Sequence, residues 1–255
     1  MADCVILWIG DSLGTIERAC IKSILRHGHS LALYCYRTPA GVPDGVEVRD
    51  ASPILPRSSI PESWMKRSDL YSDWFRYEIQ KRGLGIWLDL DVYLVAPLDL
   101  GRANLFGEYE PGKINGAVLR LPPDSPMLPK LLEPFEKSRI PDWVSWRWRL
   151  EGWARERAFG KADLLRTPFG VTGPYALTAM AHRCGLASEA LPAEVFYPVE
   201  WREASWILDP SIKPKDVTTG QTVGIHLWNE VIRRFKNEPA PQGSFLRQLQ
   251  DEGRE

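Results

Sequence analysis

The feature that most constrains this chain is a ten-residue segment, residues 85–94, in which an apolar run is interrupted by two aspartates. It reads Gly-Ile-Trp-Leu-Asp-Leu-Asp-Val-Tyr-Leu. In an extended strand alternate side chains point to the same face, so Asp89 and Asp91 are predicted to converge while Leu90 points into the protein. The apolar run before them does not alternate, which is typical of a central strand covered on both faces.

The position of the two carboxylates indicates a cation site. Ligands of open α/β sheets bind beyond the carboxyl ends of strands, which is where Asp89 and Asp91 are expected. Unpartnered carboxylates at the end of a buried strand would be costly. Oxygen ligands suit a hard cation such as Mg²⁺ or Mn²⁺, which usually bridges protein carboxylates to substrate phosphates. A solvated surface pair is the alternative interpretation of the same spacing.

Composition bounds the class of protein. The chain has 255 residues, which is enough for one large α/β domain. Its 32 Lys and Arg residues balance 33 Asp and Glu residues, which gives no support for a nucleic-acid-binding protein. No basic signal-peptide region opens the chain, and no apolar run approaches the ~20 residues of a membrane helix. We therefore expect a cytoplasmic location.

The order of predicted elements favours a parallel sheet. Residues 5–9 and 31–36 are predicted strands, with a helix over residues 15–26 between them. A second helix over residues 68–82 leads through a glycine-rich turn into the strand with the aspartates. Further strands are predicted at residues 46–48, 117–121 and 222–228, and further helices at residues 127–135, 144–157 and 174–182.

A polar stripe precedes the aspartates along the chain. Asp73, Arg76 and Gln80 share one face of the second helix at positions i, i+3 and i+7. Because this helix leads directly into the strand with Asp89, the stripe and the carboxylates could face one cleft. A weak, solvated ion pair between Asp73 and Arg76 is the alternative interpretation.

Together these segments resemble a known family. Ser-Asp-x-x-Arg-Tyr at residues 72–77, followed by Leu-Asp-Leu-Asp at residues 88–91, is similar to the signature of DXD glycosyltransferases with a GT-A fold. That group contains the α-1,4-galactosyltransferases, the initiating mannosyltransferases of yeast and, more distantly, the glucosylating clostridial toxins. Residues 6–10 and 224–229 are similar to two further motifs of the family.

The resemblance implies a fold and an activity. The fold is α/β: a GT-A type, nucleotide-sugar-binding, Rossmann-like and mostly parallel sheet flanked by helices. The activity is a metal-dependent, retaining transfer of a hexose from a nucleotide sugar to a hydroxyl of a saccharide or glycolipid acceptor. UDP is the expected nucleotide, Mn²⁺ or Mg²⁺ is the expected cofactor, and polysaccharide assembly is the expected pathway.

The resemblance also implies a metal site. Asp91 would bind the cation directly, and Asp89 would bind ribose hydroxyls or the metal through water. His226 would complete the metal or diphosphate site, with Trp228 two residues further on the same strand face. A satisfied core histidine is the alternative interpretation of His226.

The implied donor contacts come from the first half of the chain and one later asparagine. Trp8 would stack on uracil, although a tryptophan in a first strand also fits a core position. The residues that would contact the donor sugar are Ser72, Asp73, Arg76 and Asn115.

We expect a single glycosyltransferase domain over residues 1–237. Residues 1–98 would form its nucleotide-binding half, and residues 99–237 a less regular acceptor-side half. Prolines and a glycine after Asn237 indicate a loosely attached tail over residues 238–255.

Tryptophans are concentrated in residues 143–153. Trp143, Trp146, Leu150 and Trp153 lie at helical spacing, which predicts an amphipathic helix packed on the domain. Arginines beside the tryptophans motivate two alternatives: an acceptor platform, or a peripheral helix at the inner face of a membrane.

Two rival functions remain open. A phosphohydrolase of the haloacid dehalogenase type also places Asp-x-Asp after an apolar strand. Those enzymes usually begin with that strand and have Thr or Gly two residues after the second aspartate, whereas Tyr93 occupies that place here. A non-catalytic protein that binds nucleotide sugars is the second rival.

Overall fold

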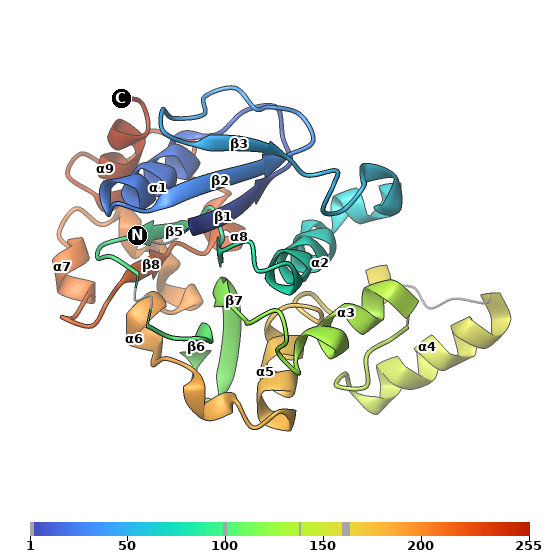
Figure 1. Ribbon diagram of the computed structural model, residues 1–255. Coiled ribbons are helices and arrows are strands. Elements are labelled where there is room, and N and C mark those ends of the chain that lie inside the picture. The colour runs from blue at the N-terminus through green and yellow to red at the C-terminus, as the bar shows by residue number, and fades with distance from the viewer. Residues whose placement is uncertain (1–2, 99–100, 138, 160–163) are drawn as a thin grey trace.

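The computed structural model describes residues 3–98, 101–137, 139–159 and 164–255 (Figure 1). The strands are β1 (Asp3–Trp8), β2 (Ser30–Cys35), β3 (Glu47–Asp50), β4 (Ile86–Leu88), β5 (Val92–Leu94), β6 (Leu105–Glu110), β7 (Lys113–Arg120) and β8 (Gly224–His226). The α-helices are α1 (Thr15–Arg26), α2 (Ser68–Lys81), α3 (Leu128–Lys137), α4 (Trp146–Phe159), α5 (Pro174–Arg183), α6 (Ala193–Phe196), α7 (Pro214–Val217), α8 (Asn229–Ile232) and α9 (Phe245–Glu252). Short 3₁₀ helices are η1 (Arg57–Ser59), η2 (Glu62–Lys66), η3 (Leu164–Arg166), η4 (Ala187–Glu189) and η5 (Trp201–Leu208).

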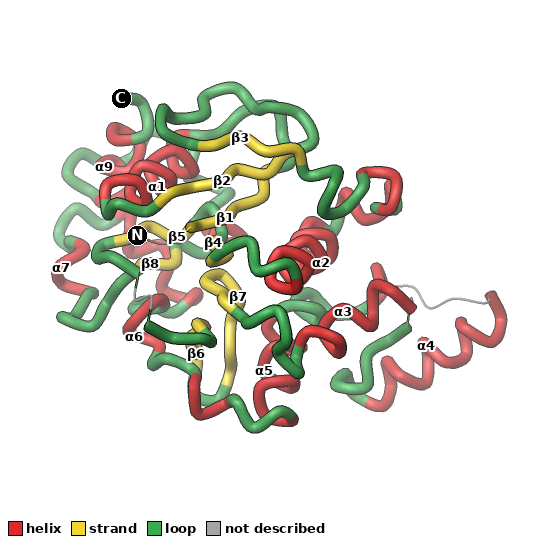
Figure 2. The backbone as a smooth tube through the Cα atoms, in the orientation of Figure 1, coloured by secondary structure: helices red, strands yellow, loops and turns green. Residues whose placement is uncertain are grey.

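A six-stranded sheet in the order β3-β2-β1-β4-β7-β6 forms the centre of the molecule. The pairs β1–β2, β1–β4 and β2–β3 are parallel, whereas β4–β7 and β6–β7 are antiparallel. Helices cover both faces, as Figure 2 shows. This arrangement confirms the predicted α/β class with a mostly parallel sheet flanked by helices, and it is consistent with a GT-A-like fold.

Strand β1 shows why the central strands are apolar without alternation. Val5 belongs to the core that also contains Phe75 of α2, whereas Cys4 and Ile6 belong to the opposite core with Ile24 of α1. Successive side chains point to opposite faces, and here each face meets a helix.

The order of strands creates a crevice at one edge of the sheet. Strand β1 lies between β2 and β4 and runs parallel to both, so the carboxyl ends of β1 and β4 are neighbours. The chain leaves β1 toward β2 on one side, and β4 continues the sheet on the other, which is the switch point where open sheets bind ligands. Trp8 ends β1 and Asp89 follows β4, so both residues lie at this crevice.

The turn between α2 and β4 requires a glycine. Gly85 has φ +138°, and a Cβ atom there would lie 2.4 Å from the carbonyl oxygen of Asp3. Only glycine permits this approach of the turn to the start of β1. The turn thereby fixes where α2 ends and β4 begins beside β1.

The segment over residues 85–94 is not one strand, contrary to our prediction. It forms β4 in the main sheet and β5 in a separate antiparallel pair with β8, and a turn at residues 89–91 separates them. The pairing that divides residues 85–94 comes from β7 and β8, which lie far along the chain. Strand β6 was also not predicted.

The C-terminal tail is not loosely attached, which corrects a second expectation. Helix α9 buries Phe245, Leu246 and Leu249 in a core that it shares with α1. The Gln250 side-chain amide donates hydrogen bonds to backbone carbonyls of the preceding loop at 3.0 and 2.7 Å. The apolar face of α9 holds the tail, and the prolines of this segment gave no sign of it. The division of the domain into two halves stays a prediction, and the main sheet takes strands from both.

Helix α4 projects at the edge of the molecule (Figure 1). Trp143, just before the helix, packs against the core and donates a hydrogen bond to the Val171 carbonyl at 2.8 Å. Trp146, Leu150 and Trp153 instead lie in solvent, so the prediction that this stripe packs on the domain is wrong for these three side chains. Within the parts of the chain that the structure describes, no helix combines the length and apolar character needed to cross a membrane.

Candidate active site

The two aspartates lie in the turn that joins β4 to β5. The Asp89 amide donates to the Ala117 carbonyl of β7 at 2.8 Å, and the Val92 amide donates to the Asp89 carbonyl at 3.1 Å. The predicted reason for their convergence, alternation along one strand, is therefore wrong. The turn brings the two carboxylates together instead.

Asp89, Asp91 and His226 form a cluster in which one ligand atom of each lies within 4.8 Å of the others. His226 reaches the cluster because it pairs with Val92 across the β5–β8 sheet. His226 Nε2 lies 3.4 Å from Asp91 Oδ2, and the Asn229 amide donates to the same oxygen at 2.7 Å. The structure thus brings together the three residues to which the resemblance assigns a metal site.

The Asp91 carboxyl is held in its ionised form. Enclosure by the protein raises its pKa, but His226 and the Asn229 amide outweigh this effect, and the pKa lies below its ordinary value. Asp91 therefore offers a full negative charge at neutral pH.

The donor set of this cluster fits a divalent cation. Two carboxylates and an imidazole supply oxygen and nitrogen ligands, which suit Mn²⁺ and related ions. Among the described residues, Nδ1 of His226 is buried and has no hydrogen-bond partner. An unpaired buried polar atom is costly, so a ligand for this ring would remove a penalty.

Arg76 connects the cluster to helix α2. Its guanidinium donates to Asp89 Oδ1 at 2.8 Å and to Asp73 Oδ1 at 3.0 Å, and Trp87 Nε1 donates to Asp89 Oδ1 at 2.7 Å. Burial lowers the pKa of Arg76, but Asp89 and Asp73 outweigh it and raise the pKa. Asp73 and Arg76 are 4% and 5% exposed, so the interpretation as a solvated surface pair is wrong.

Asp73 is held from the opposite side by a loop that the sequence did not single out. The Thr172 hydroxyl donates to Asp73 Oδ2 at 2.7 Å, and a Cβ atom on Gly173 would lie 2.9 Å from that oxygen. Burial raises the pKa of Asp73 to about 7, against the opposing effects of Arg76 and Thr172. Arg76 shares its guanidinium with Asp89, so it does not fully offset the burial of Asp73. The sequence predicts only that a helix begins beside this loop, at residue 174.

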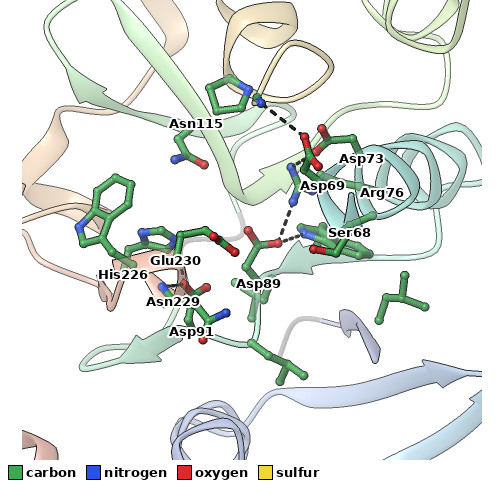
Figure 3. A pocket seen from close by; sticks show the side chains of 18 of the residues that line it. Ser68, Asp69, Asp73, Arg76, Asp89, Asp91, Asn115, His226, Asn229 and Glu230 are labelled. Atoms are coloured by element: carbon green, nitrogen blue, oxygen red, sulfur yellow. Dashed lines mark hydrogen bonds and ion pairs between the residues drawn. The ribbon is translucent and has the colours of Figure 1, made fainter. Parts of the chain in front are cut away.

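One cavity of about 710 Å³ contains the whole arrangement. Figure 3 shows Asp89 in the middle, with Arg76 and Asp73 on one side and Asp91 and His226 on the other. Every residue to which the resemblance assigns a site role lines this cavity: Trp8, Ser72, Asp73, Arg76, Asp89, Asp91, Asn115, His226 and Trp228. Gln80 of the predicted polar stripe does not, because its side chain bonds the Gly85 carbonyl and the Leu121 amide instead.

The two predicted tryptophans occupy different kinds of position. Trp8 is half-buried at the end of β1, and its Nε1 has no hydrogen-bond partner among the described residues. Trp228 lies beyond the end of β8 with φ 58°, so it does not share a strand face with His226 as predicted. This left-handed backbone turns the indole back toward His226, and the two rings lie 4.2 Å apart at 88°. The Trp228 Nε1 donates to the Val199 carbonyl at 2.9 Å.

Ser72 on α2 and Asn115 on β7 are half-buried, and both line the cavity. The Asn115 side-chain oxygen accepts a hydrogen bond from the Ala117 amide at 2.9 Å, which fixes the carboxamide on β7. Several aromatic rings that the sequence analysis missed also line the cavity, namely Tyr109, Phe169, Tyr175 and Trp201. No periodic pattern in the sequence distinguishes these rings from core residues.

Comparison with known proteins adds one finding. Residues 167–251 match the model of a family described as the alpha 1,4-glycosyltransferase conserved region. No curated protein matches the chain. The matched segment contains Thr172 and His226, but it begins after the two aspartates and Arg76. The match supports a glycosyltransferase.

Proposed function

We propose that this chain is a metal-dependent, retaining glycosyltransferase that moves a hexose from a UDP-linked donor to a hydroxyl of a saccharide or glycolipid. The observation that carries the proposal is the cluster of Asp89, Asp91 and His226 within one cavity. The family match, which covers His226, supports glycosyl transfer independently. The resemblance of the aspartate segment to DXD glycosyltransferases supports the same reaction.

In this proposal, Asp91 and His226 hold Mn²⁺ or Mg²⁺, and Asp89 contributes directly or through water. When bound, the cation supplies neutralisation of the negative charge that builds on the diphosphate leaving group. The contacts of Arg76 and Trp87 fix the Asp89 carboxylate in advance, so little reorganisation accompanies binding.

The donor binds along the remaining walls of the cavity. Trp8, at the end of β1, stacks on the uracil ring, and Trp228 lies beside the diphosphate. Ser72 on α2 and Asn115 on β7 offer polar groups to the sugar hydroxyls, together with Asp73 and Arg76. The positions of these side chains on one cavity support this assignment.

The phosphohydrolase alternative has weaker support. It needs a carboxylate free to attack phosphorus. Asp89 is engaged by Arg76 and Trp87, and Asp91 is engaged by the Asn229 amide and His226. Engaged carboxylates of this kind favour cation binding over nucleophilic attack.

We further propose that α4 makes peripheral contact with an anionic membrane, at the inner face if the protein is cytoplasmic. Trp146, Leu150 and Trp153 are exposed along one side of the helix. Arginines within and beside this stripe can meet lipid phosphates. These are Arg147, Arg149 and Arg157, whereas Arg155 lies on the opposite side of the helix and pairs with Glu151 at 3.4 Å.

Release of nucleotide from UDP-, GDP- and CMP-sugars tests the proposed reaction, with and without a panel of saccharide acceptors. We expect UDP release from a UDP-hexose in Mn²⁺, faster with a suitable acceptor, and none in chelator. Binding of UDP-hexose without release under any of these conditions would identify the non-catalytic alternative. Hydrolysis of p-nitrophenyl phosphate without UDP release would identify the phosphohydrolase.

A further inference from the structure

The mouth of the cavity carries three strongly exposed aromatic rings. Phe169, Tyr175 and Trp201 are 61%, 56% and 41% exposed, yet all three line the same cavity as the aspartate cluster. Large apolar side chains grouped around a concave polar site usually mark a ligand or partner surface.

Trp201 is held in a defined orientation although it is exposed. Its Nε1 donates to Glu110 Oε1 at 3.3 Å, and the Arg202 guanidinium lies 4.4 Å from the centre of the indole. Arg202 is itself paired with Glu110 at 3.4 Å. The guanidinium covers one side of the ring, and the ring has little freedom to lose when a ligand binds.

Phe169 lies on the loop before α5, and Tyr175 lies in the first turn of α5. This segment is tied to α2. The Gly170 amide donates to Asp69 Oδ2 at 3.5 Å, and the Tyr77 hydroxyl donates to the Thr172 carbonyl at 2.6 Å. The Tyr175 amide donates to the Gly170 carbonyl at 3.2 Å, which closes the loop at the start of α5. These rings are therefore presented by an anchored segment.

The chemistry around the rings selects an amphipathic, uncharged ligand. A pyranose ring has an apolar face of C–H groups, which fits the electron-rich face of an aromatic ring, and a rim of hydroxyls. Glu110 and Arg202 contact Trp201, and Lys113 pairs with Glu110. Groups of both signs therefore lie beside the ring, which suit hydroxyls better than one charged ligand. A purely apolar partner would leave these charged groups desolvated without compensation.

We propose that Phe169, Tyr175 and Trp201 form the acceptor subsite, in which a pyranose unit of the acceptor stacks at the mouth of the cavity. The inference rests on the proposed glycosyl transfer and assigns its second substrate to a saccharide surface. It replaces the acceptor platform predicted at residues 143–153, because none of the described residues that line the cavity comes from α4.

Saturation-transfer NMR with methyl β-D-galactopyranoside, methyl β-D-glucopyranoside and methyl α-D-mannopyranoside tests the subsite. UDP and Mn²⁺ are added first, so that the donor region is filled. We expect at least one pyranoside to bind the wild-type protein, with stronger transfer to one face of the sugar. Trp201→Ala and Tyr175→Ala should each weaken that binding about tenfold.

Two further variants make the result specific. Trp201→Phe keeps a stacking ring and should retain most of the binding. Trp146→Ala removes a still more exposed tryptophan from α4 and should leave binding unchanged. Tm values of all variants close to that of the wild type verify folding.

The outcomes separate this inference from the proposed function. If UDP with Mn²⁺ binds the wild type but no pyranoside does, the acceptor subsite is wrong and the donor site stands. Equal pyranoside binding by the wild type and Trp201→Ala leads to the same conclusion. If UDP with Mn²⁺ does not bind, the proposed function fails, and the acceptor subsite fails with it.

Discussion

Two regions depart from the usual distribution of side chains in opposite directions. One is the floor of the cavity, which consists of Asp73 and Arg76, and the other is helix α4. The floor buries charge, with Asp73 and Arg76 enclosed between α2 and the loop at Thr172. Helix α4 exposes apolar area, with Trp146 and Trp153 at 68% and 60% exposure. Buried charges and exposed large apolar groups are the two informative exceptions to the normal pattern.

The comparison teaches what each region requires from a partner. On the floor, each buried charge already has protein partners, so the added ligand must be small and must fit a fixed set of groups. On α4 the tryptophans point outward over a convex helix, so the matching partner must present a broad surface. The following changes test this contrast.

The largest effect is expected at Asp91. Asp91→Asn keeps an oxygen that can accept from the Asn229 amide but removes the negative charge. We expect metal-dependent UDP release to fall by about 100- to 1000-fold. Asp142→Asn, at an exposed carboxylate, is the matched control and should keep full activity. Retention of more than a tenth of the wild-type rate by Asp91→Asn would contradict the role of this residue.

Arg76 should contribute the most to stability among the charged residues of the floor. Arg76→Met leaves the Asp73 and Asp89 carboxylates without their shared cation. We expect the free energy of unfolding to fall by about 3–5 kcal/mol in denaturant titrations. Arg202→Met removes an exposed arginine that also contacts a carboxylate, and it should cost less than about 1 kcal/mol. If the free energy of unfolding fell equally in the two variants, burial would not make the Arg76 ion pairs contribute more to stability than an exposed pair.

The raised pKa of Asp73 predicts a pH dependence of stability. Between the usual value of 3.8 and about 7, the unfolded chain releases this proton while the folded chain keeps it. The contribution of Asp73 is therefore complete below pH 4 and is lost as the pH rises to about 7, with a slope of at most about 1.4 kcal/mol per pH unit.

The variant Asp73→Asn cannot release the proton. The difference in unfolding free energy, wild type minus variant, should decrease from pH 4 to pH 7 and stay constant above that. A difference that increases over this range would mean that the folded state favours the ionised carboxylate.

The smallest effect is expected on α4, where no activity should change. Binding to vesicles that contain phosphatidylserine, measured by co-sedimentation, should weaken about tenfold in the double variant Trp146→Ala and Trp153→Ala. The Tm should stay constant because both rings are exposed. Absence of vesicle binding by the wild type would contradict membrane contact through this helix.

The sequence predicts the first half of the fold well because its patterns are local. Helix α1 has the predicted bounds, and α2 ends one residue before its predicted end. Both helices have apolar faces with helical spacing and end next to glycines. The nine predicted site residues also share one cavity. Trp8, Asp89 and His226 end or follow strands, and α2 and β7 bring further polar side chains to the same place.

What could not be predicted depends on partners that lie far apart in the chain. The division of residues 85–94 into β4 and β5 follows from pairing with β7 and β8, which a run of apolar letters does not encode. The exposure of Trp146 and Trp201 could not be predicted either, because tryptophans with the same spacing are also found in hydrophobic cores. Asp73 shows a third limit, because its support by Thr172 depends on a loop about a hundred residues later.

Calorimetric titration of UDP tests the central claim most directly, with the wild type and Asp91→Asn each measured in Mn²⁺ and in chelator. The account predicts binding to the wild type in Mn²⁺ alone, and loss of that binding in the variant. Equal UDP affinity in Mn²⁺ and in chelator, or unchanged metal-dependent binding in Asp91→Asn, would contradict a cation held at this turn.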